Sequence, residues 1–237
     1  MRTSLIVLAG FVLCVVAAGK SASQKVPASA ASRVDHLVFG SPDLQLGIDT
    51  IERLLGVRAT PGGQHPGRGT RNALVALGPA TYLEIIGPDP EQPTPESPRT
   101  FGLDNLKATR LVAWAAREPD LERLVADAAK KGVTLGVIGS GSRKRADDVL
   151  LSWRYTSPAT VVADRIAPFF IDWGASPHPA KNAAPDAKLV ALRAEHPDAA
   201  RVRQTLLHLG IDLAVGQGPA PALIATVECP KGRVELR

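Results

Sequence analysis

The sequence predicts an α+β fold of paired βαβββ modules that form a cupped mixed sheet, with a third partial module at the C-terminus. Two observations support this prediction. A Pro-Asp pair begins at Pro42, Pro119 and Pro197, and a glycine follows these prolines after 14, 13 and 13 residues. Short β-like runs flank each of these segments. Because the three prolines are 77 and 78 residues apart, the chain repeats one supersecondary unit.

The first module is expected over residues 34–87. A β-like run at 34–39 precedes a helix that opens at the Pro-Asp pair, since proline fixes φ in a first turn and an acidic side chain is favoured by the helix dipole. Gly56 supplies a left-handed C-terminal cap. Three further β-like runs follow, at 57–59, 73–77 and 81–86.

The second and third modules repeat this order. The second, residues 109–174, has β-like runs at 111–115, 133–138, 149–155 and 166–173 around a helix that ends at Gly132. The third, residues 188–237, is expected as a partial βαβ-type module packed on the other two, with its last strand absent or very short. Loops rich in proline or alanine connect the modules.

The N-terminal residues are typical of a signal peptide. Arg2 precedes an uncharged stretch at 5–19, and small residues follow it. Fifteen apolar residues fall short of the roughly 18 to 20 that span a bilayer, so cleavage is favoured over a permanent anchor. We therefore expect a signal peptide at 1–23, a linker at 24–32, and a periplasmic or secreted protein with no stable membrane span after cleavage.

The amino-acid composition limits the classes of molecule that the protein is expected to bind. The chain has 237 residues, and its 45% of hydrophobic residues is typical of a globular protein. Its net charge is +5, and two of the positively charged residues, Arg2 and Lys20, lie in the N-terminal leader. Aromatic residues make up only 4%, so stacking platforms for nucleic acid are not expected. Cys229 is the one cysteine beyond the leader; it has no internal disulfide partner and leaves a disulfide-linked homodimer open.

Three segments carry a resemblance to a known family. They are Asp35-His36-Leu37-Val38 on the first strand, Gly69 to Leu74 entering a later strand, and Tyr82 to Ile86 on the last strand of the first module. Together with the paired modules, they resemble the vicinal oxygen chelate (VOC) superfamily, and within it the glyoxalase-like branch. This superfamily includes isomerases, epimerases, dioxygenases and metal-free binding proteins, so the fold alone does not choose a reaction.

The resemblance implies a divalent metal, Zn, Fe, Mn, Co or Ni, held by a first-strand and a last-strand ligand of each module. His36 and Glu84 match those places in the first module. In the second module the matching residues are Ala113 and Ile171, which are not ligands, so the usual set is halved. Metal binding and a polar metal-free pocket both remain open for this pair. Without metal, Glu84 is a candidate general base.

Other residues are candidates for the same site. His65 and His178 lie in loops and would complete a metal site, or else form plain turns. Arg71 and Asn72 enter a strand where the arginine would bind a carboxylate or phosphate and the amide a carbonyl or hydroxyl of a small substrate, or else they satisfy turn groups. Phe170 and Trp173 would line the cavity, with core packing as the alternative. The glycine-rich segment 62–69 is interpreted as a flexible loop, and the basic run 143–145 as a solvated hairpin tip.

Two functions follow as hypotheses. The first is an exported, metal-assisted lyase, isomerase or oxygenase that acts on a small carbonyl or vicinal-oxygen compound. The second is a metal-free protein of the same fold that binds a small molecule without catalysis; the missing ligands of the second module favour it.

Overall fold

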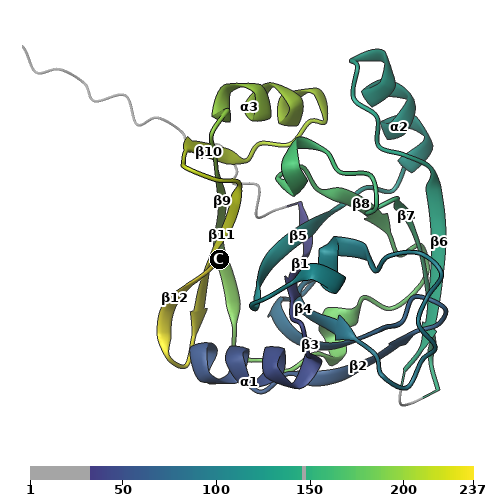
Figure 1. The fold of residues 1–237 in the computed structure, drawn as a ribbon, viewed down its shortest axis with the longest axis vertical. Coiled ribbons are helices and arrows are strands. Elements are labelled where there is room, and N and C mark those ends of the chain that lie inside the picture. Colours follow the sequence, from purple (N-terminus) through teal and green to yellow (C-terminus); the bar gives the residue numbers. More distant parts are fainter. Residues whose placement is uncertain (1–32, 146–147) are drawn as a thin grey trace, which may run out of the picture.

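The computed structural model describes residues 33–145 and 148–237. The predicted signal peptide and linker lie outside the described residues. Within these described ranges the fold has two sheets and three α-helices (Figure 1). No helix in the described ranges is both long and apolar enough to cross a membrane.

The larger sheet has eight strands in the order β2-β3-β4-β1-β5-β8-β7-β6. Its first half is β1 (Val34–Gly40), β2 (Thr60–His65), β3 (Thr70–Gly78) and β4 (Thr81–Pro88), with α1 (Leu44–Leu55) after β1. Its second half is β5 (Arg110–Arg117), β6 (Ile138–Lys144), β7 (Leu150–Thr156) and β8 (Phe169–Asp172), with α2 (Leu121–Lys130) after β5. Each half therefore has the predicted order βαβββ, and the α+β fold class with paired modules is confirmed.

The two halves are joined at the middle of the sheet and meet again at its edges. β1 pairs antiparallel with β5, and each first strand pairs parallel with the last strand of its own half. At the outer edges, Arg143 of β6 donates a hydrogen bond from Nη1 to the carbonyl oxygen of Gly62 in β2. The sheet thus curls into a nearly closed cup.

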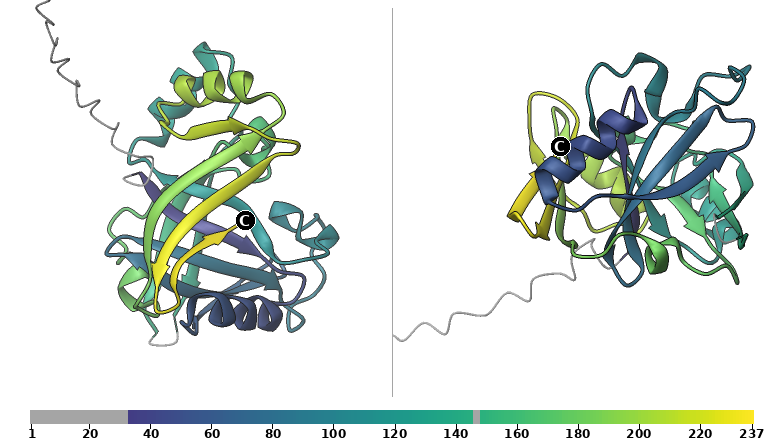
Figure 2. Two further views of the ribbon diagram at one scale, coloured as in Figure 1. Left: turned by 90° about the vertical axis from the view of Figure 1, so that its left-hand side faces the viewer. Right: turned by 90° about the horizontal axis from the view of Figure 1, so that it is seen from below.

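The C-terminal unit departs from the expected partial module. It contains β9 (Lys188–His196), α3 (Ala199–His208), β10 (Ala214–Gln217), β11 (Ala222–Cys229) and β12 (Gly232–Leu236), which is a full set of four strands and a helix. Their order is β10-β9-β11-β12, because β9 pairs parallel with β10 and antiparallel with β11. The unit therefore repeats the element order of the modules, with a different sheet (Figure 2).

All three helices use their Pro-Asp pair in the same way. The aspartates are N-caps: the side chains of Asp43, Asp120 and Asp198 accept hydrogen bonds from the backbone N–H groups of Leu46, Arg123 and Arg201. The prolines thus lie before the cap, two positions earlier than a proline at the first helical residue. Gly56 ends α1 with φ 74°, a left-handed conformation that glycine adopts without a steric penalty.

One hydrophobic core joins the two sheets. Leu37 of β1 and Ile85 of β4 are fully buried in the same apolar cluster as Leu206 of α3 and Ala225 of β11. Leu37 and Ile85 lie on the face of the larger sheet that is turned away from the inside of the cup. The C-terminal unit therefore covers the outside of the cup, and the inside stays available for a ligand.

Candidate functional site

A cavity of about 290 Å³ occupies the inside of the cup. Both modules line it, and the residues used below are His36, His65, Arg68, Asn72, Tyr82, Glu84, Phe101, Arg143, Trp153, Tyr155, Phe169, Ile171 and Trp173. Strand alternation explains the polar floor, because side chains two residues apart share a face of the sheet. Tyr82 and Glu84 of β4 point into the cup, whereas Leu83 and Ile85 belong to the core on the other face.

Glu84 is the acidic residue of the cavity lining, and polar groups surround it. The amide Nδ2 of Asn72 donates to Oε1 of Glu84 at 2.5 Å. The Nε2 atom of His36 lies 3.8 Å from Oε2, and the Nε2 atom of His65 lies 3.7 Å from Oε1. One carboxylate oxygen is therefore fixed by an amide, and two imidazoles flank the group.

His36 is oriented by a carboxylate behind it. Nδ1 of His36 donates to Oδ1 of Asp35 at 2.8 Å, which fixes the proton on Nδ1 because an ionised carboxylate only accepts. A shift of strand register between Val34 and His36 accompanies this placement of neighbouring side chains. The imidazole also stacks on Tyr82, with ring centroids 4.6 Å apart. Nε2 is thereby held toward Glu84.

Asp35 is fully buried and anchors three rings. It accepts hydrogen bonds from His36, from Nε1 of Trp173 at 3.1 Å and from Nε2 of His178 at 3.1 Å. Burial alone would raise the pKa of Asp35, but the hydrogen bonds from His178 and His36 outweigh it and hold the pKa well below its ordinary value. Asp35 is therefore ionised and positions the groups around it.

His65 is held as a neutral imidazole. Burial lowers its pKa from the ordinary value of 6.5, and the nearby Glu84 only partly offsets this effect. Nδ1 lies 2.9 Å from Oγ1 of Thr70, and Nε2 lies 3.3 Å from Nδ2 of Asn72. With Nδ1 donating to the threonine, Nε2 accepts from the amide. His65 and Glu84 thus share the Asn72 amide.

The donor set does not fit a metal ion as it stands. His36, His65 and Glu84 are residue types that bind divalent metals. However, the Asn72 amide is hydrogen-bonded to Glu84 and contacts His65, so it occupies the approach between these two donors. Among the residues that the structure describes, no group of three or more His, Cys, Asp or Glu has the arrangement of metal ligands.

His178, the fourth predicted ligand, lies behind the cavity floor. Its Nε2 is hydrogen-bonded to Asp35, and its Nδ1 accepts from the backbone N–H of Ala180 at 3.2 Å. Both ring nitrogens are therefore engaged within the protein. The structure gives His178 the position of a residue that orients Asp35.

Of the four residues predicted to contact the substrate, two line the cavity and two do not. Asn72 and Trp173 line the cavity. Arg71 alternates to the other side of β3, where its Nε lies 3.9 Å from Oδ1 of Asp89, and Phe170 is wholly buried in the core between the sheets. Neither residue is part of the cavity lining, and Phe170 takes the core-packing alternative, since each lies one residue from a strand position that faces the cup.

Sequence reasoning missed the basic residues of the cavity. Arg143 was expected at a solvated tip, yet it is 5% exposed and lies in β6, and Arg68 follows β2. Segment 62–69, expected to be a flexible loop, contributes part of the β2 strand. The sequence does contain a signal for Arg143. Gly139, Gly141 and Arg143 are two residues apart along β6, so the arginine lies on the same face of the strand as two glycines, which leave space for its side chain.

Comparison with known proteins identifies the family. Residues 34–210 match the glyoxalase-like domain family, and the chain belongs to this family. None of the curated proteins that were compared matches the sequence.

Solved structures are similar in fold. A hypothetical protein from Staphylococcus aureus is 14% identical, covers 85% of this chain and 83% of its own, and has a TM-score of 0.55. Methylmalonyl-CoA epimerase from Mycobacterium tuberculosis is 18% identical over 62% of this chain and 91% of its own, with a TM-score of 0.38. The Streptomyces coelicolor epimerase, in complex with 2-nitronate-propionyl-CoA, is 17% identical over 59% of this chain and 94% of its own, with a TM-score of 0.39.

Proposed function

We propose that this glyoxalase-like protein is an enzyme that binds a small carbonyl compound in the cup and transfers a proton at the carbon next to the carbonyl group, with Glu84 as the general base. The observation that carries the proposal is the placement of Glu84. It is the acidic residue of a lining that both modules build, it is 7% exposed, and one of its oxygens is fixed by Asn72. A positioned carboxylate in a concave cavity lined by both polar and aromatic side chains suits proton transfer.

The step balances without any further reagent. Glu84 takes the proton as the C–H bond breaks, the C–H electron pair forms the C=C bond of an enolate, and the carbonyl π pair moves onto oxygen. Return of a proton from Glu84 to carbon restores a carbonyl compound. Asn72 holds Oε1, so Oε2 is the oxygen that faces the reacting carbon.

Hydrogen exchange tests this function. In D2O, the wild type should catalyse incorporation of deuterium next to the carbonyl of a small ketone or 2-oxo acid, observed by proton NMR. Glu84→Gln keeps the size of the side chain and removes the base, so exchange should fall by roughly 100-fold or more. A matched control is Glu122→Gln, which changes an exposed glutamate that pairs with Arg154 outside the cavity.

A second function is favoured by a separate observation. The second module has Ala113 and Ile171 at the two positions that metal ligands take in the resembled superfamily, and its Ile171 and Phe169 line the cavity. Such a lining suits a metal-free protein that binds a small apolar molecule without turnover. Ligand binding by the wild type with no exchange in any carbonyl compound would favour this function over the enzyme.

We also propose that the protein is exported and that its signal peptide is removed. The support is the charge and apolar pattern of residues 1–23. Mass spectrometry of the protein from the periplasmic and extracellular fractions should give an N-terminus near residue 24. An intact N-terminus in the cytoplasmic fraction would contradict export.

A further inference from the structure

Two arginines line the cavity and have no role in the proposed proton transfer. Arg143 lies on β6 of the second module, and Arg68 lies between β2 and β3 of the first. Each bridges the two modules where the edges of the cup meet, Arg143 through Gly62 and Arg68 through the hydroxyl of Tyr155.

Arg143 is a buried cation with little compensation. Its one hydrogen bond among the described residues is the donation from Nη1 to the carbonyl oxygen of Gly62. Within residues 33–145 and 148–237 its guanidinium forms no ion pair with a carboxylate, and Glu84 of the same cavity attracts it only from beyond ion-pair distance. A buried charge that only a backbone carbonyl satisfies is costly, unless an anion joins it.

Arg68 is held over the same space by an aromatic ring. Its Nη2 donates to the hydroxyl of Tyr155, and its guanidinium carbon lies 5.2 Å from the centroid of that ring. The Tyr155 hydroxyl in turn donates to the carbonyl oxygen of Ser140 at 3.3 Å. Within the described part of the chain Arg68 also has no ion pair, so its remaining N–H groups are free to bind an acceptor.

Among the arginine, lysine, aspartate and glutamate side chains of the lining, basic groups outnumber acidic ones. They are Arg68 and Arg143 against Glu84 alone. Asp35 does not line the cavity, and its carboxylate is taken up by hydrogen bonds from His36, Trp173 and His178. The cavity thus offers two guanidinium groups, which bind carboxylates strongly through paired N–H donors.

We infer that the substrate or ligand of this cavity carries a carboxylate, which Arg143 and Arg68 bind together across the junction of the two modules. The rest of the molecule is apolar, because Phe101, Phe169, Trp153 and Trp173 line the same cavity. The inference deepens the proposed function by naming a carboxylate-bearing carbonyl compound, and it rests on that function only for the carbonyl group.

A matched pair of small molecules tests the inference. 2-Oxo-4-phenylbutanoate and 4-phenylbutan-2-one share a skeleton and a ketone, and differ by a carboxylate in place of a methyl group. Calorimetric titration should show that the acid binds at least roughly 10-fold more tightly than the ketone, as a charge-assisted interaction implies. The Glu84→Gln protein should show at least the same preference, because the variant removes an acidic group that repels the ligand carboxylate, and binding is then measured apart from turnover.

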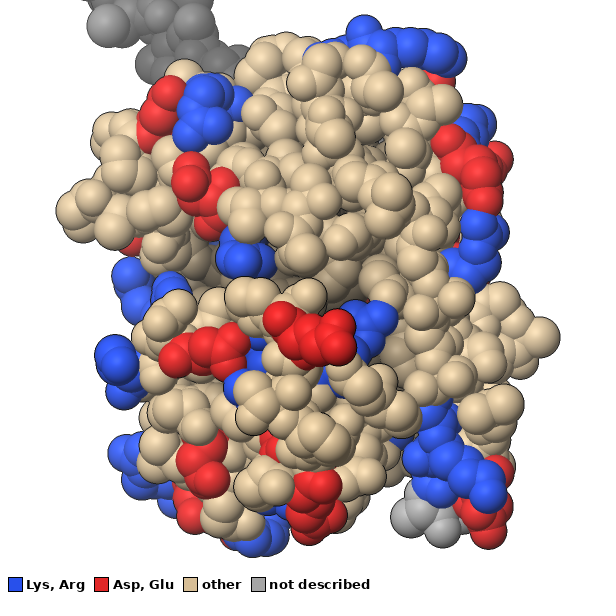
Figure 3. All heavy atoms as spheres, turned by 45° about the vertical axis from the view of Figure 1, so that its right-hand side comes forward, with Lys and Arg blue, Asp and Glu red and all other residues tan. Residues whose placement is uncertain are grey.

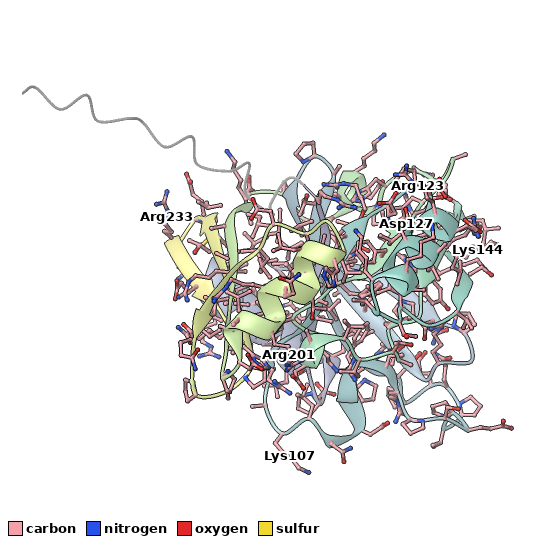
Figure 4. All side chains as sticks on the ribbon, turned by 90° about the horizontal axis from the view of Figure 1, so that it is seen from above. Lys107, Arg123, Asp127, Lys144, Arg201 and Arg233 are labelled. Atoms are coloured by element: carbon pink, nitrogen blue, oxygen red, sulfur yellow. The ribbon has the colours of Figure 1, made fainter. Side chains whose placement is uncertain are left out.

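Arginine variants assign the preference to this pair. Arg143→Gln and Arg68→Gln should each reduce the preference for the acid by roughly 10-fold and leave the affinity for the ketone nearly unchanged. Lys144→Gln is the matched control: it removes a charge from the next residue of β6, and its side chain is 67% exposed at the outer edge of the molecule (Figure 4). It should leave both affinities unchanged.

Several outcomes would overturn the inference. They are equal binding of the acid and the ketone, no binding of the acid, or an equal loss for both compounds in the arginine variants. If Arg143→Gln fails to fold, because it also closes the cup, Arg68→Gln gives the same test from a turn. If the preference for the acid persists while no deuterium exchange occurs, the anion site stands and the proposed enzymatic function fails.

Discussion

At the scale of single residues, Asp35 connects the site to the stability of the protein. Asp35→Asn keeps the shape of the side chain but removes the charge that His36, His178 and Trp173 share. We expect a loss of about 3 kcal/mol in the free energy of unfolding, because buried donors lose an ionised acceptor. Urea denaturation of Asp35→Asn measures this loss. The control is Asp172→Asn, at the C-terminal end of β8.

The same variant gives a pH signature. The pKa of Asp35 is depressed in the folded state, so its stabilising contribution is present above its ordinary pKa of 3.8 and is lost as pH falls through the lower folded value. The difference in stability between wild type and Asp35→Asn should therefore be constant from pH 6 to 8 and shrink below about pH 4. A difference that grows as the pH falls would contradict this account of Asp35.

The sequence predicted part of the site at this scale. His36 and Glu84 were named from their match to the ligand positions of the resembled superfamily, and Asn72 from its place at the entrance of a strand; all three line the cavity. Arg143 was not, because its place in the cavity depends on the curl of the whole sheet, which brings β6 to β2. The position of Asp35 beside His36 depends on a local register shift that no sequence pattern marks.

At the scale of elements, the contact between β2 and β3 requires a glycine. A Cβ atom added at Gly62 would lie 2.1 Å from Oδ1 of Asn72, so the side chain that fixes Glu84 would have to move. Gly62→Ala should cost about 1–3 kcal/mol in stability and also reduce deuterium exchange. Gly216→Ala on β10 is the control, because its nearest neighbour would be 3.9 Å away. Equal stability of the two variants would contradict the contact.

The elements themselves were predicted better than their pairing. The Pro-Asp and glycine signals placed all three helices, since capping is a local property. These signals do not predict the strand order of the C-terminal sheet. In that sheet β9 pairs with β10 on one side and β11 on the other, and β12 pairs with β11 alone. β6 begins at Ile138, later than the run at 133–138 suggests, and thereby carries Arg143 into the cup.

At the scale of the whole molecule, the shared core predicts that both sheets unfold together. Leu206 of α3 is 1% exposed and packs in the core that also contains residues of the larger sheet, whereas its neighbour Leu207 is 65% exposed. The three tryptophans, Trp114, Trp153 and Trp173, all lie in the first two modules.

Leu206→Ala should therefore lower the stability reported by tryptophan fluorescence by about 2–5 kcal/mol, in a single transition. Leu207→Ala should leave it nearly unchanged. If the fluorescence transition is insensitive to Leu206→Ala, the C-terminal unit folds independently and the shared core does not couple the sheets.

The surface of the whole molecule is mixed in charge on the face shown in Figure 3. Lysine and arginine side chains there lie among aspartate and glutamate side chains, so the small net positive charge does not gather into one patch on this face. The two arginines that are proposed to bind the ligand, Arg68 and Arg143, line the cavity inside the cup. We therefore expect ligand affinity to depend mainly on these cavity residues and only weakly on the charges of this face.

The most direct test of the central claim is deuterium exchange catalysed by protein that has been freed of divalent metal with a chelator and checked by elemental analysis. Exchange next to the carbonyl of 2-oxo-4-phenylbutanoate should persist in metal-free protein and be lost in Glu84→Gln. Exchange that disappears with the metal, and returns with one equivalent of Zn, Fe, Mn, Co or Ni, would contradict it. That result would assign His36, His65 and Glu84 to a metal centre.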